Sequence, residues 1–506
     1  MYETRSDQVS VFEDETLFEV RGLDPENEWI RLAKLIPWSK LERGYAKTFD
    51  SEVGNAAKSA RMAIGSLIIK DRYQFSDEDT LQEIRMNPYL QYFIGLPMFQ
   101  YHAPFDQSTM TLFRKRVPVD IMARLNDYII GRGDPYKEEE GQDDSDDSEG
   151  GPSAISREAA EKAEIQAEAL ENPESELRNH GTLILDATCV PQDICYPTDI
   201  GLLNKARESL EQMISESYPV GNKPRTYRRK ARKDFLKYSK NRKPGKNLLR
   251  KSIRKQLGYV LRDIGYVEMV KHLLSEKDQN CFEVIGTLYS QQKEMFDNKT
   301  NRVDDRIVSL HEPWVRPIVR GKVKAPTEFG AKVGISLVDG YARVETLSWD
   351  AFHEGTTLKE IVEAYHRDTG FYPERILADK AYRSRENLQY CKEHGIRVSG
   401  PKLGRPPKDK ALYRQQLHDE WKESGERAEV ECVFGVGKRR YSLNRIMMRL
   451  QHTSELAIHT SILTMNLWKK LRALLFVLLW AVLKRAEKTL FSVMNTWRSY
   501  GQIVLR

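Results

Sequence analysis

Two short apolar runs that each lead into an aspartate constrain the fold of this chain more than any other feature. Residues 183–185 run into Asp186, and residues 376–378 run into Asp379. Each run has the length and composition of a buried strand whose last side chain emerges at the edge of a sheet. Ligands of open α/β sheets bind at such strand ends. The sequence therefore predicts an α/β sheet that carries two carboxylates at its ligand-binding edge.

A third carboxylate, Glu431, lies between two cations at helical spacing. Arg427 precedes it by four residues and Lys438 follows it by seven, so a helix would place the three on one face. That face also carries Val430 and Phe434, and its net positive charge suits a docked polyanion and a divalent metal. Carboxylate oxygens are the ligands that Mg²⁺ or Mn²⁺ favours. Two such ions about 4 Å apart can activate an attacking hydroxyl and stabilise the leaving oxygen of a phosphodiester.

Each of these candidates has a structural alternative. Asp186 and Asp379 could cap turns, and Lys380, which could neutralise a phosphate, could instead be only exposed. Glu429 competes with Glu431 for the role of third ligand, although residues two apart face different sides of a helix. A supporting role near the site is open for three further residues, namely Asp199, Glu328 and Lys332.

A dense basic segment at residues 223–255 holds sixteen lysines and arginines against one acid, Asp234. Aromatic residues alternate with these cations, which suits contact with a phosphate backbone. A solvated helix face is the alternative interpretation for a weaker charge run. The cations chosen as DNA-binding candidates are Arg228, Arg229, Lys230, Arg232 and Lys233. No convincing strand occurs near them, so the segment belongs to a predicted helical insertion between the first and second strands.

The remaining patterns divide the chain. Two β-rich runs around Asp339-Gly340 predict a hairpin, and helices are expected at 357–368 and 384–394, with a strand at 395–399. Ser76 is a candidate N-cap within a helical region. The predicted division is a helical DNA-binding or dimerisation domain at 1–135, an acidic disordered linker at 136–156, a lead-in helix with the first strand at 157–200, the basic insertion at 201–310, the rest of the catalytic core at 311–470, and a helical tail at 471–506. A purely structural N-terminal bundle is the alternative.

Five motifs in order resemble those of DDE transposases of bacterial insertion sequences. They are Leu185-Asp186-Ala-Thr with Tyr196-Pro-Thr-Asp199, then Pro326-Thr-Glu-Phe329, then Ala378-Asp379-Lys-Ala-Tyr382, then Arg427-x-x-x-Glu431 with Lys438, and an N-terminal Ala103-Pro-Phe-Asp106 segment. Ser424 departs from the pattern, because related transposases often carry tyrosine there. The resemblance covers roughly residues 60 to 470.

The resemblance implies a ribonuclease-H-like catalytic core and a role for each site residue. Asp186 would bridge two metal ions, Asp379 would bind one and Glu431 the other, while Arg427 and Lys438 would hold phosphate. The enzyme would cleave DNA at the element ends and transfer the freed 3′-hydroxyl strand into target DNA. Two other interpretations stay open, which are a metal-dependent nuclease without strand transfer and an inactive transposase-derived repressor.

Composition limits the compartment and the partners. Five cysteines form no CxxC pair, so zinc-finger spacing is absent, and an odd count favours a reducing cytoplasm. The longest apolar run, residues 473–483, is shorter than the roughly 20 residues that span a bilayer. It predicts a buried or partner-facing helix, with an interfacial membrane helix as the alternative. The expected partners are terminal inverted repeats, target DNA and a second copy of the chain as a dimer, without a membrane, in the nucleoid-associated cytoplasm.

Overall fold

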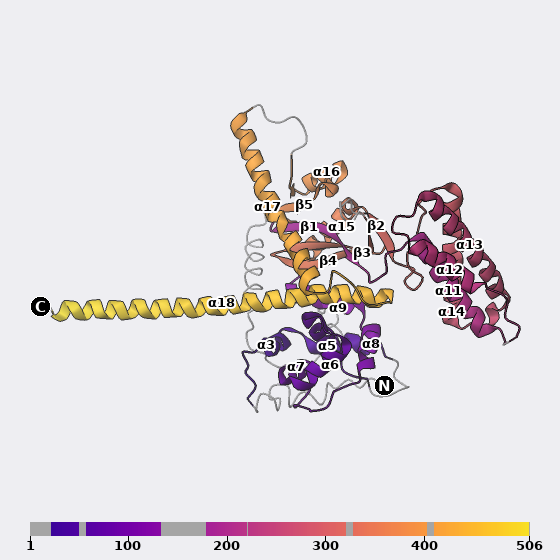
Figure 1. Cartoon of the computed structure of the whole chain (residues 1–506). Coiled ribbons are helices and arrows are strands. Elements are labelled where there is room, and N and C mark those ends of the chain that lie inside the picture. Colours follow the sequence, from indigo (N-terminus) through magenta and orange to yellow (C-terminus); the bar gives the residue numbers. More distant parts are fainter. Residues whose placement is uncertain are drawn as a thin grey trace.

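The computed structural model describes most of the chain, in residues 22–49, 57–132, 179–219, 221–319, 327–401 and 409–504. The linker predicted at 136–156 lies outside these stretches, and so does the lead-in helix expected after residue 157. A helical N-terminal unit precedes a mixed sheet with helices on both faces, and a helical insertion follows the first strand (Figure 1). The predicted combination of an α/β core with helical N-terminal and inserted regions is therefore present in the described residues.

The N-terminal unit is built from helices that surround one apolar core. Ser76 caps its helix as predicted, because its hydroxyl accepts the Asp79 N–H at 3.0 Å and the Asp79 carboxylate accepts the Ser76 N–H at 3.4 Å. Trp29 and Phe93 meet edge to face at 4.8 Å in the core. The described helices of this unit are α3 (Glu28–Leu35), α4 (Trp38–Ala46), α5 (Ala60–Tyr73), α6 (Asp77–Met86), α7 (Pro88–Phe93), α8 (Gln107–Arg116) and α9 (Val119–Ile130).

The sheet has the strand order β2-β3-β1-β5-β6, and β4 also pairs with β3. β3 runs antiparallel to β1, β2 and β4, whereas β5 and β6 run parallel to β1. The strands are β1 (Thr182–Pro191), β2 (Arg316–Val319), β3 (Thr327–Val338), β4 (Tyr341–Ser348), β5 (Arg375–Ala378) and β6 (Arg397–Val398).

The predicted hairpin joins β3 to β4. Asp339 and Gly340 have positive φ angles of 52° and 72°, as a two-residue type I′ turn requires. Two expectations about the strands were incomplete. Asp186 does not end β1, because β3 pairs with β1 through Pro191 and keeps it extended. The short strand β2 was not predicted, since Pro317 lies inside it and Pro is tolerated only on edge strands such as this one.

Helices cover both faces of the sheet because β1 is apolar on both sides. Leu183 and Leu185 pack toward α15 (Leu358–Thr369) and α16 (Arg385–Glu393). Ile184 points the other way and shares a core with α17 (Lys410–Arg440), the helix that carries Glu431. The alternation along β1 thus sends Asp186 to the same face as α17.

The insertion forms its own helical lobe to one side of the sheet (Figure 1). Its position between β1 and β2 confirms the predicted location of a helical insertion. Apolar side chains from α11, α13 and α14 build its core, including Leu210, Val260 and Ile285. The helices of the lobe are α11 (Asp199–Ser217), α12 (Arg228–Ser239), α13 (Lys246–Met269) and α14 (Glu276–Asn298), with the short η2 (Lys271–Leu273).

The long helix α18 (Gln451–Val504) joins the N-terminal unit to the sheet. Leu463 and Leu467 belong to the N-terminal core, whereas Ile458 and Ile462 belong to the sheet core. Beyond Leu471 the helix projects from the body (Figure 1). There the apolar run expected to be buried exposes large side chains in the single chain, among them Leu475, Phe476, Val477 and Trp480. No helix among the described residues is long and apolar enough to cross a membrane.

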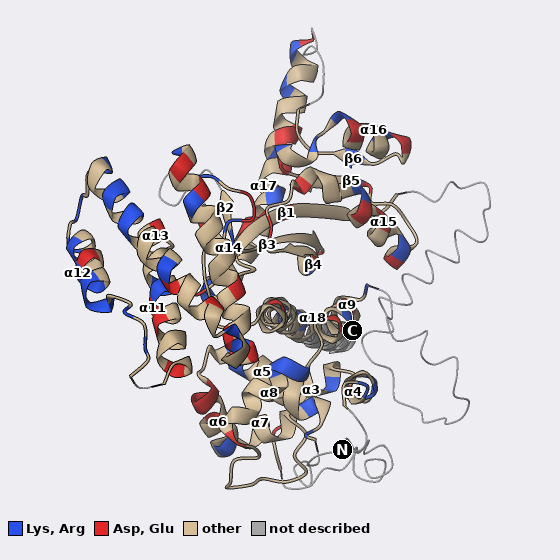
Figure 2. Ribbon diagram, turned by 90° about the vertical axis from the view of Figure 1, so that its right-hand side faces the viewer, with Lys and Arg blue, Asp and Glu red and all other residues tan. Residues whose placement is uncertain are grey.

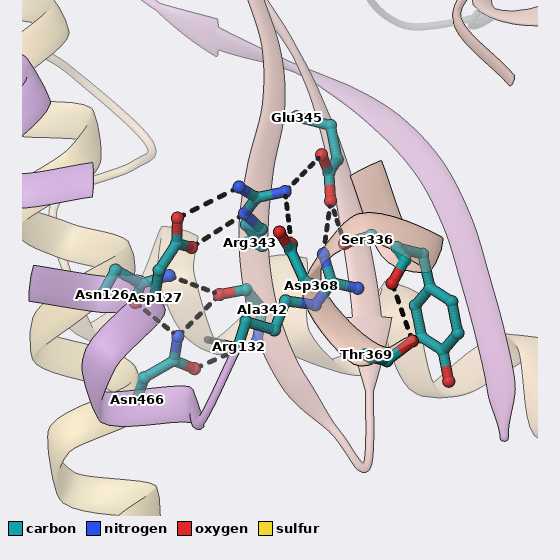
Figure 3. A network of polar contacts seen from close by, with 11 residues as sticks. Asn126, Asp127, Arg132, Ser336, Ala342, Arg343, Glu345, Asp368, Thr369 and Asn466 are labelled. Atoms are coloured by element: carbon teal, nitrogen blue, oxygen red, sulfur yellow. Dashed lines mark hydrogen bonds and ion pairs between the residues drawn. The ribbon is translucent and has the colours of Figure 1, made fainter. Parts of the chain in front are cut away.

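A buried charge network fixes α9 against the sheet (Figure 3). Arg343 on β4 donates to both oxygens of Asp127, at 2.8 and 3.0 Å, and faces Asp368 at 3.5 Å. Arg132, just after α9, pairs with Glu345 at 2.9 Å, and both side chains are only 5% exposed. Because charges this deeply buried need partners, the network specifies how the N-terminal unit docks on the sheet.

Candidate active site

The register of two parallel strands brings Asp186 and Asp379 side by side. The last paired residues of β1 and β5 are Leu185 and Ala378, and each aspartate directly follows its member of the pair. Each carboxylate accepts a hydrogen bond from the next backbone N–H, at 2.8 Å for Asp186 and 2.7 Å for Asp379. Asp379 thereby caps the turn η4 (Lys380–Tyr382). The backbone therefore sets the position of both aspartates.

Arg427 connects this pair to Glu431. Its guanidinium nitrogens lie 3.8 Å from a carboxylate oxygen of Asp186 and 3.6 Å from one of Glu431. The second contact is an i,i+4 pair on α17, which confirms that Arg427 and Glu431 share a helix face. Glu431 is 63% exposed while Asp186 is 18% exposed. Among the described residues, no three Asp, Glu, His or Cys side chains are close enough to hold one metal ion.

The charges around Asp186 repel one another. Burial raises the pKa of the Asp186 carboxyl, and the negative charges of Glu354 and Asp379 raise it further. The Ala187 N–H and the Arg427 guanidinium act in the opposite direction. Burial also raises the pKa of Tyr382, and Glu354, Asp186 and Asp379 again raise it. Partly buried oxygen donors with excess negative charge are the chemistry that a divalent cation favours.

Glu354 is the acidic neighbour that the sequence interpretation missed. It opens the turn η3 (Glu354–Thr357), a few residues after the end of β4. Lys332 on β3, which was considered as a supporting residue, pairs with it at 3.0 Å. Its spacing from β4 gave no local signal, because the aspartates directly follow paired strand residues whereas Glu354 comes several residues after its strand.

Of three other candidates, Lys438 and Asp199 have contacts of their own and Lys380 is exposed. Lys438 donates to the backbone oxygen of Cys189 at 2.8 Å, which ties the end of α17 to β1. Asp199 accepts from Arg306 at 2.6 Å and from Gln292 at 3.1 Å within the insertion, so no contact joins it to the aspartates. Lys380 is exposed immediately after Asp379.

The basic candidates of the insertion form an exposed strip. Arg228, Arg229, Lys230, Arg232 and Lys233 all lie on α12 and are exposed. Figure 2 shows the lysines and arginines along α12 and α13. Among the described residues of this basic segment, Asp234 forms an ion pair with Lys255 at 2.8 Å. Ala231 is buried instead and anchors α12 by accepting from Gln256 on α13 at 3.3 Å. A strip of nearly uncompensated cations suits a polyanion.

Two segments of the chain match known protein families. The family described as "Transposase DDE domain" matches residues 376–468, which include Asp379, Arg427 and Glu431. The family described as "Transposase domain (DUF772)" matches residues 19–116 of the N-terminal unit. Both segments match transposase families, and these matches support a DDE transposase of the insertion-sequence type. Asp186 lies outside both matched segments.

One curated relative is a protein of Rhizobium meliloti named "Uncharacterized protein ORF8 in nfe locus". It is 29% identical to this chain over 188 residues, which cover 37% of this chain and 73% of the relative. No solved structure matches the chain.

Proposed function

We propose that this transposase cleaves phosphodiester bonds at the ends of its insertion sequence and transfers the 3′-hydroxyl strands into target DNA at Asp186, Asp379 and Glu431. The observation that carries the proposal is the pairing of Leu185 with Ala378, which sets the two aspartates next to each other. The Arg427 contacts to Asp186 and Glu431 support adding the helical glutamate to them.

A ribonuclease-H-like core is part of this proposal. Without the short strand β2, the strand order is β4-β3-β1-β5-β6. The pairs β4–β3 and β3–β1 are antiparallel, and the pairs β1–β5 and β5–β6 are parallel. This order agrees with the resemblance that the sequence motifs carry. In such an arrangement the first strand is central, so a carboxylate on it has access to neighbours from the parallel half and from a covering helix.

The residues present fit one or two divalent cations. Asp186 and Asp379 offer hard oxygen donors, the first partly buried and the second exposed, and the negative charges of Glu354 and Asp379 both act on Asp186. Bound there, Mg²⁺ or Mn²⁺ would activate the attacking hydroxyl and stabilise the leaving oxygen. Glu431 is exposed on the neighbouring helix, and a rotation of its side chain is the movement that would bring it to the aspartates.

Arg427 and the two lysines have separate roles in the proposal. With the carboxylates occupied by cations, the Arg427 guanidinium is free to hold a phosphate oxygen through charge-assisted hydrogen bonds. Lys380 is exposed beside Asp379 and would neutralise a neighbouring phosphate. Lys438 would contribute to phosphate binding only after leaving, or while sharing, its bond to Cys189.

DNA would also contact the strip on α12. Its exposed cations would bind phosphates without reading sequence, while the N-terminal unit would contact the element end. We further propose that the domain division expected from the sequence applies to the working enzyme. It would act as a dimer on paired terminal inverted repeats, in the nucleoid-associated cytoplasm.

A cleavage assay tests the proposal. The full-length transposase is incubated with Mg²⁺ or Mn²⁺ and a duplex that carries the inverted repeats flanking its own gene. We expect nicks at the repeat tips and products joined to a target plasmid. The Asp186→Asn, Asp379→Asn and Glu431→Gln variants should bind the duplex and show a cleavage rate at least about 10³-fold lower. Normal cleavage by any of these variants would remove that residue from the site, and cleavage without joining would favour the nuclease interpretation.

A further inference from the structure

The turn η3 is locked to the turn that follows Asp379. The Asn387 amide donates to the Gly355 carbonyl at 2.7 Å and to the Tyr382 carbonyl at 2.9 Å, so one side chain bridges both turns. A Cβ atom added at Gly355 would lie 2.5 Å from the Ala381 carbonyl oxygen. The two backbones are therefore in direct contact, two residues after Asp379, and Glu354 immediately precedes this contact.

The Glu354 side chain is itself fixed. It is 19% exposed and pairs with Lys332, which is 16% exposed. The Lys332 ammonium also donates to the Phe352 carbonyl at 2.7 Å and lies over the Phe352 ring, 4.6 Å from its centroid. A lysine with these three contacts has little freedom, so it holds the glutamate in one place instead of moving with it.

Tyr382 lies within electrostatic range of three carboxylates. The residue is 1% exposed, burial raises the pKa of its hydroxyl, and the charges of Glu354, Asp186 and Asp379 raise this pKa further. Two cations, Arg427 on Asp186 and Lys332 on Glu354, face these carboxylates at 3.8 and 3.0 Å. Arg427 also pairs with a second carboxylate, that of Glu431. The cluster therefore carries more negative than positive charge.

We propose that Glu354 is a positioning residue of the metal site, and that Lys332 holds it where its charge raises the affinity of Asp186 and Asp379 for a divalent cation. The proposal rests on the proposed function, since it deepens the same site. Glu354 acts through charge, because no three carboxylates of the described chain are close enough to share one ion. The competing explanation is that the Lys332–Glu354 pair only stabilises the turn.

Mn²⁺ binding to the full-length protein without DNA separates these explanations. Isothermal titration calorimetry of Glu354→Gln should show about tenfold weaker Mn²⁺ binding than the parent chain, since removing one nearby charge is worth about 1.4 kcal/mol. The matched control is Glu360→Gln, an exposed acid of the neighbouring helix α15, which should bind Mn²⁺ like the parent. Wild-type affinity in a folded Glu354→Gln variant would overturn the proposal.

Two further variants keep the outcomes distinct. Circular dichroism at the titration temperature checks folding, and if Glu354→Gln does not fold, Glu354→Asp replaces it. That variant keeps the charge but withdraws it by one methylene, so affinity should fall about threefold, and an unchanged value would again overturn the proposal. Asp186→Asn and Asp379→Asn are titrated in parallel. If they weaken binding and Glu354→Gln does not, only this inference fails, whereas unchanged binding in both aspartate variants refutes the proposed metal site.

Discussion

Removing the Glu345 carboxylate should open the junction between the N-terminal unit and the sheet. Glu345 pairs with Arg132 at 2.9 Å and with Arg343 at 3.2 Å, and it accepts the Ser336 hydroxyl at 2.5 Å. Arg343 keeps Asp127 and Asp368 when the glutamate is replaced. In the described structure Arg132 forms its ion pair with Glu345, its side chain is 5% exposed, and Asp368 and Asp127 act on it only at longer range. Glu345→Ala therefore leaves one buried guanidinium without an ion-pair partner.

Breaking a buried pair by removing one partner costs about 3–5 kcal/mol. Amide hydrogen exchange is the suitable assay, because a chain of 506 residues does not unfold in one cooperative step. Amides of α9 and β4 that exchange through opening of the junction should exchange about 10²- to 10³-fold faster in Glu345→Ala. The control is Asp120→Ala on α9, which removes an exposed pair with Arg124 at 3.9 Å and should change the opening free energy by less than about 1 kcal/mol.

The double variant Arg132→Met/Glu345→Ala tests whether an unpaired charge is the cause. If it is, removing Arg132 as well should recover a large part of the cost, with a coupling of about 1–3 kcal/mol. Exchange in Glu345→Ala at the wild-type rate would show that the pair contributes nothing to docking. Simple additivity of the two single substitutions would show that the cost comes from poorer packing.

Three further predictions concern DNA cleavage, DNA affinity and pH. Glu429→Gln should retain most of the cleavage activity that Glu431→Gln loses, because the two residues face different sides of α17. Equal losses in the gel assay would contradict the assignment of Glu431 as the third metal ligand. Replacing the five cations of α12 at 228–230, 232 and 233 with glutamine should lower affinity for all duplexes and reduce the slope of log K against log salt, by about one for each phosphate that is no longer neutralised; an unchanged slope would exclude this surface. Burial raises the pKa of Asp71 to about 7, so its stabilising protonation is complete below about pH 4 and disappears as the pH rises to 7. Burial lowers the pKa of His459 to about 4, which gives the opposite slope between pH 4 and 6.5. The two should largely cancel between pH 5 and 6.5. In Asp71→Asn the opening free energy of α5 and α18, measured by amide hydrogen exchange, should therefore rise by up to about 1.4 kcal/mol per pH unit; a flat profile in that variant would contradict the assignment.

The two strands that carry the aspartates could be predicted because each is a local pattern, whereas their pairing joins distant residues and was expected only from the rule that strand ends carry the ligand site. Short apolar runs specify the strands that carry Asp186 and Asp379, and the Asp339-Gly340 turn specifies the hairpin beside them. The residue at which β1 ends could not be predicted from the sequence, since it depends on pairing with β3, which is distant in the chain. Glu354 was missed for a related reason, because its approach to the site depends on the packing of η3 against η4.

The tail of α18 shows a different limit. Its apolar residues 473–483 predicted burial or a partner, and composition cannot distinguish between the two. In the structure the helix contributes described core residues as far as Leu471, where the N-terminal unit and the sheet flank it, and the described side chains of Phe476 and Trp480 beyond that point are exposed. A partner-facing role for this part of the helix therefore stays a prediction.

The three proposed ligands are held with different rigidity, and this difference shapes how the site would assemble. Asp186 and Asp379 follow paired strand residues and accept backbone N–H groups, so moving either requires breaking the sheet register. Glu431 depends on a helix whose Val430 is buried against the sheet and whose Lys438 is bonded to β1. α17 is thus held on both sides of Glu431, whose own side chain is exposed. On the proposed metal site, a cation at Asp186 would replace the charge that Arg427 offers this carboxylate at 3.8 Å, and we expect the guanidinium then to be free for a DNA phosphate.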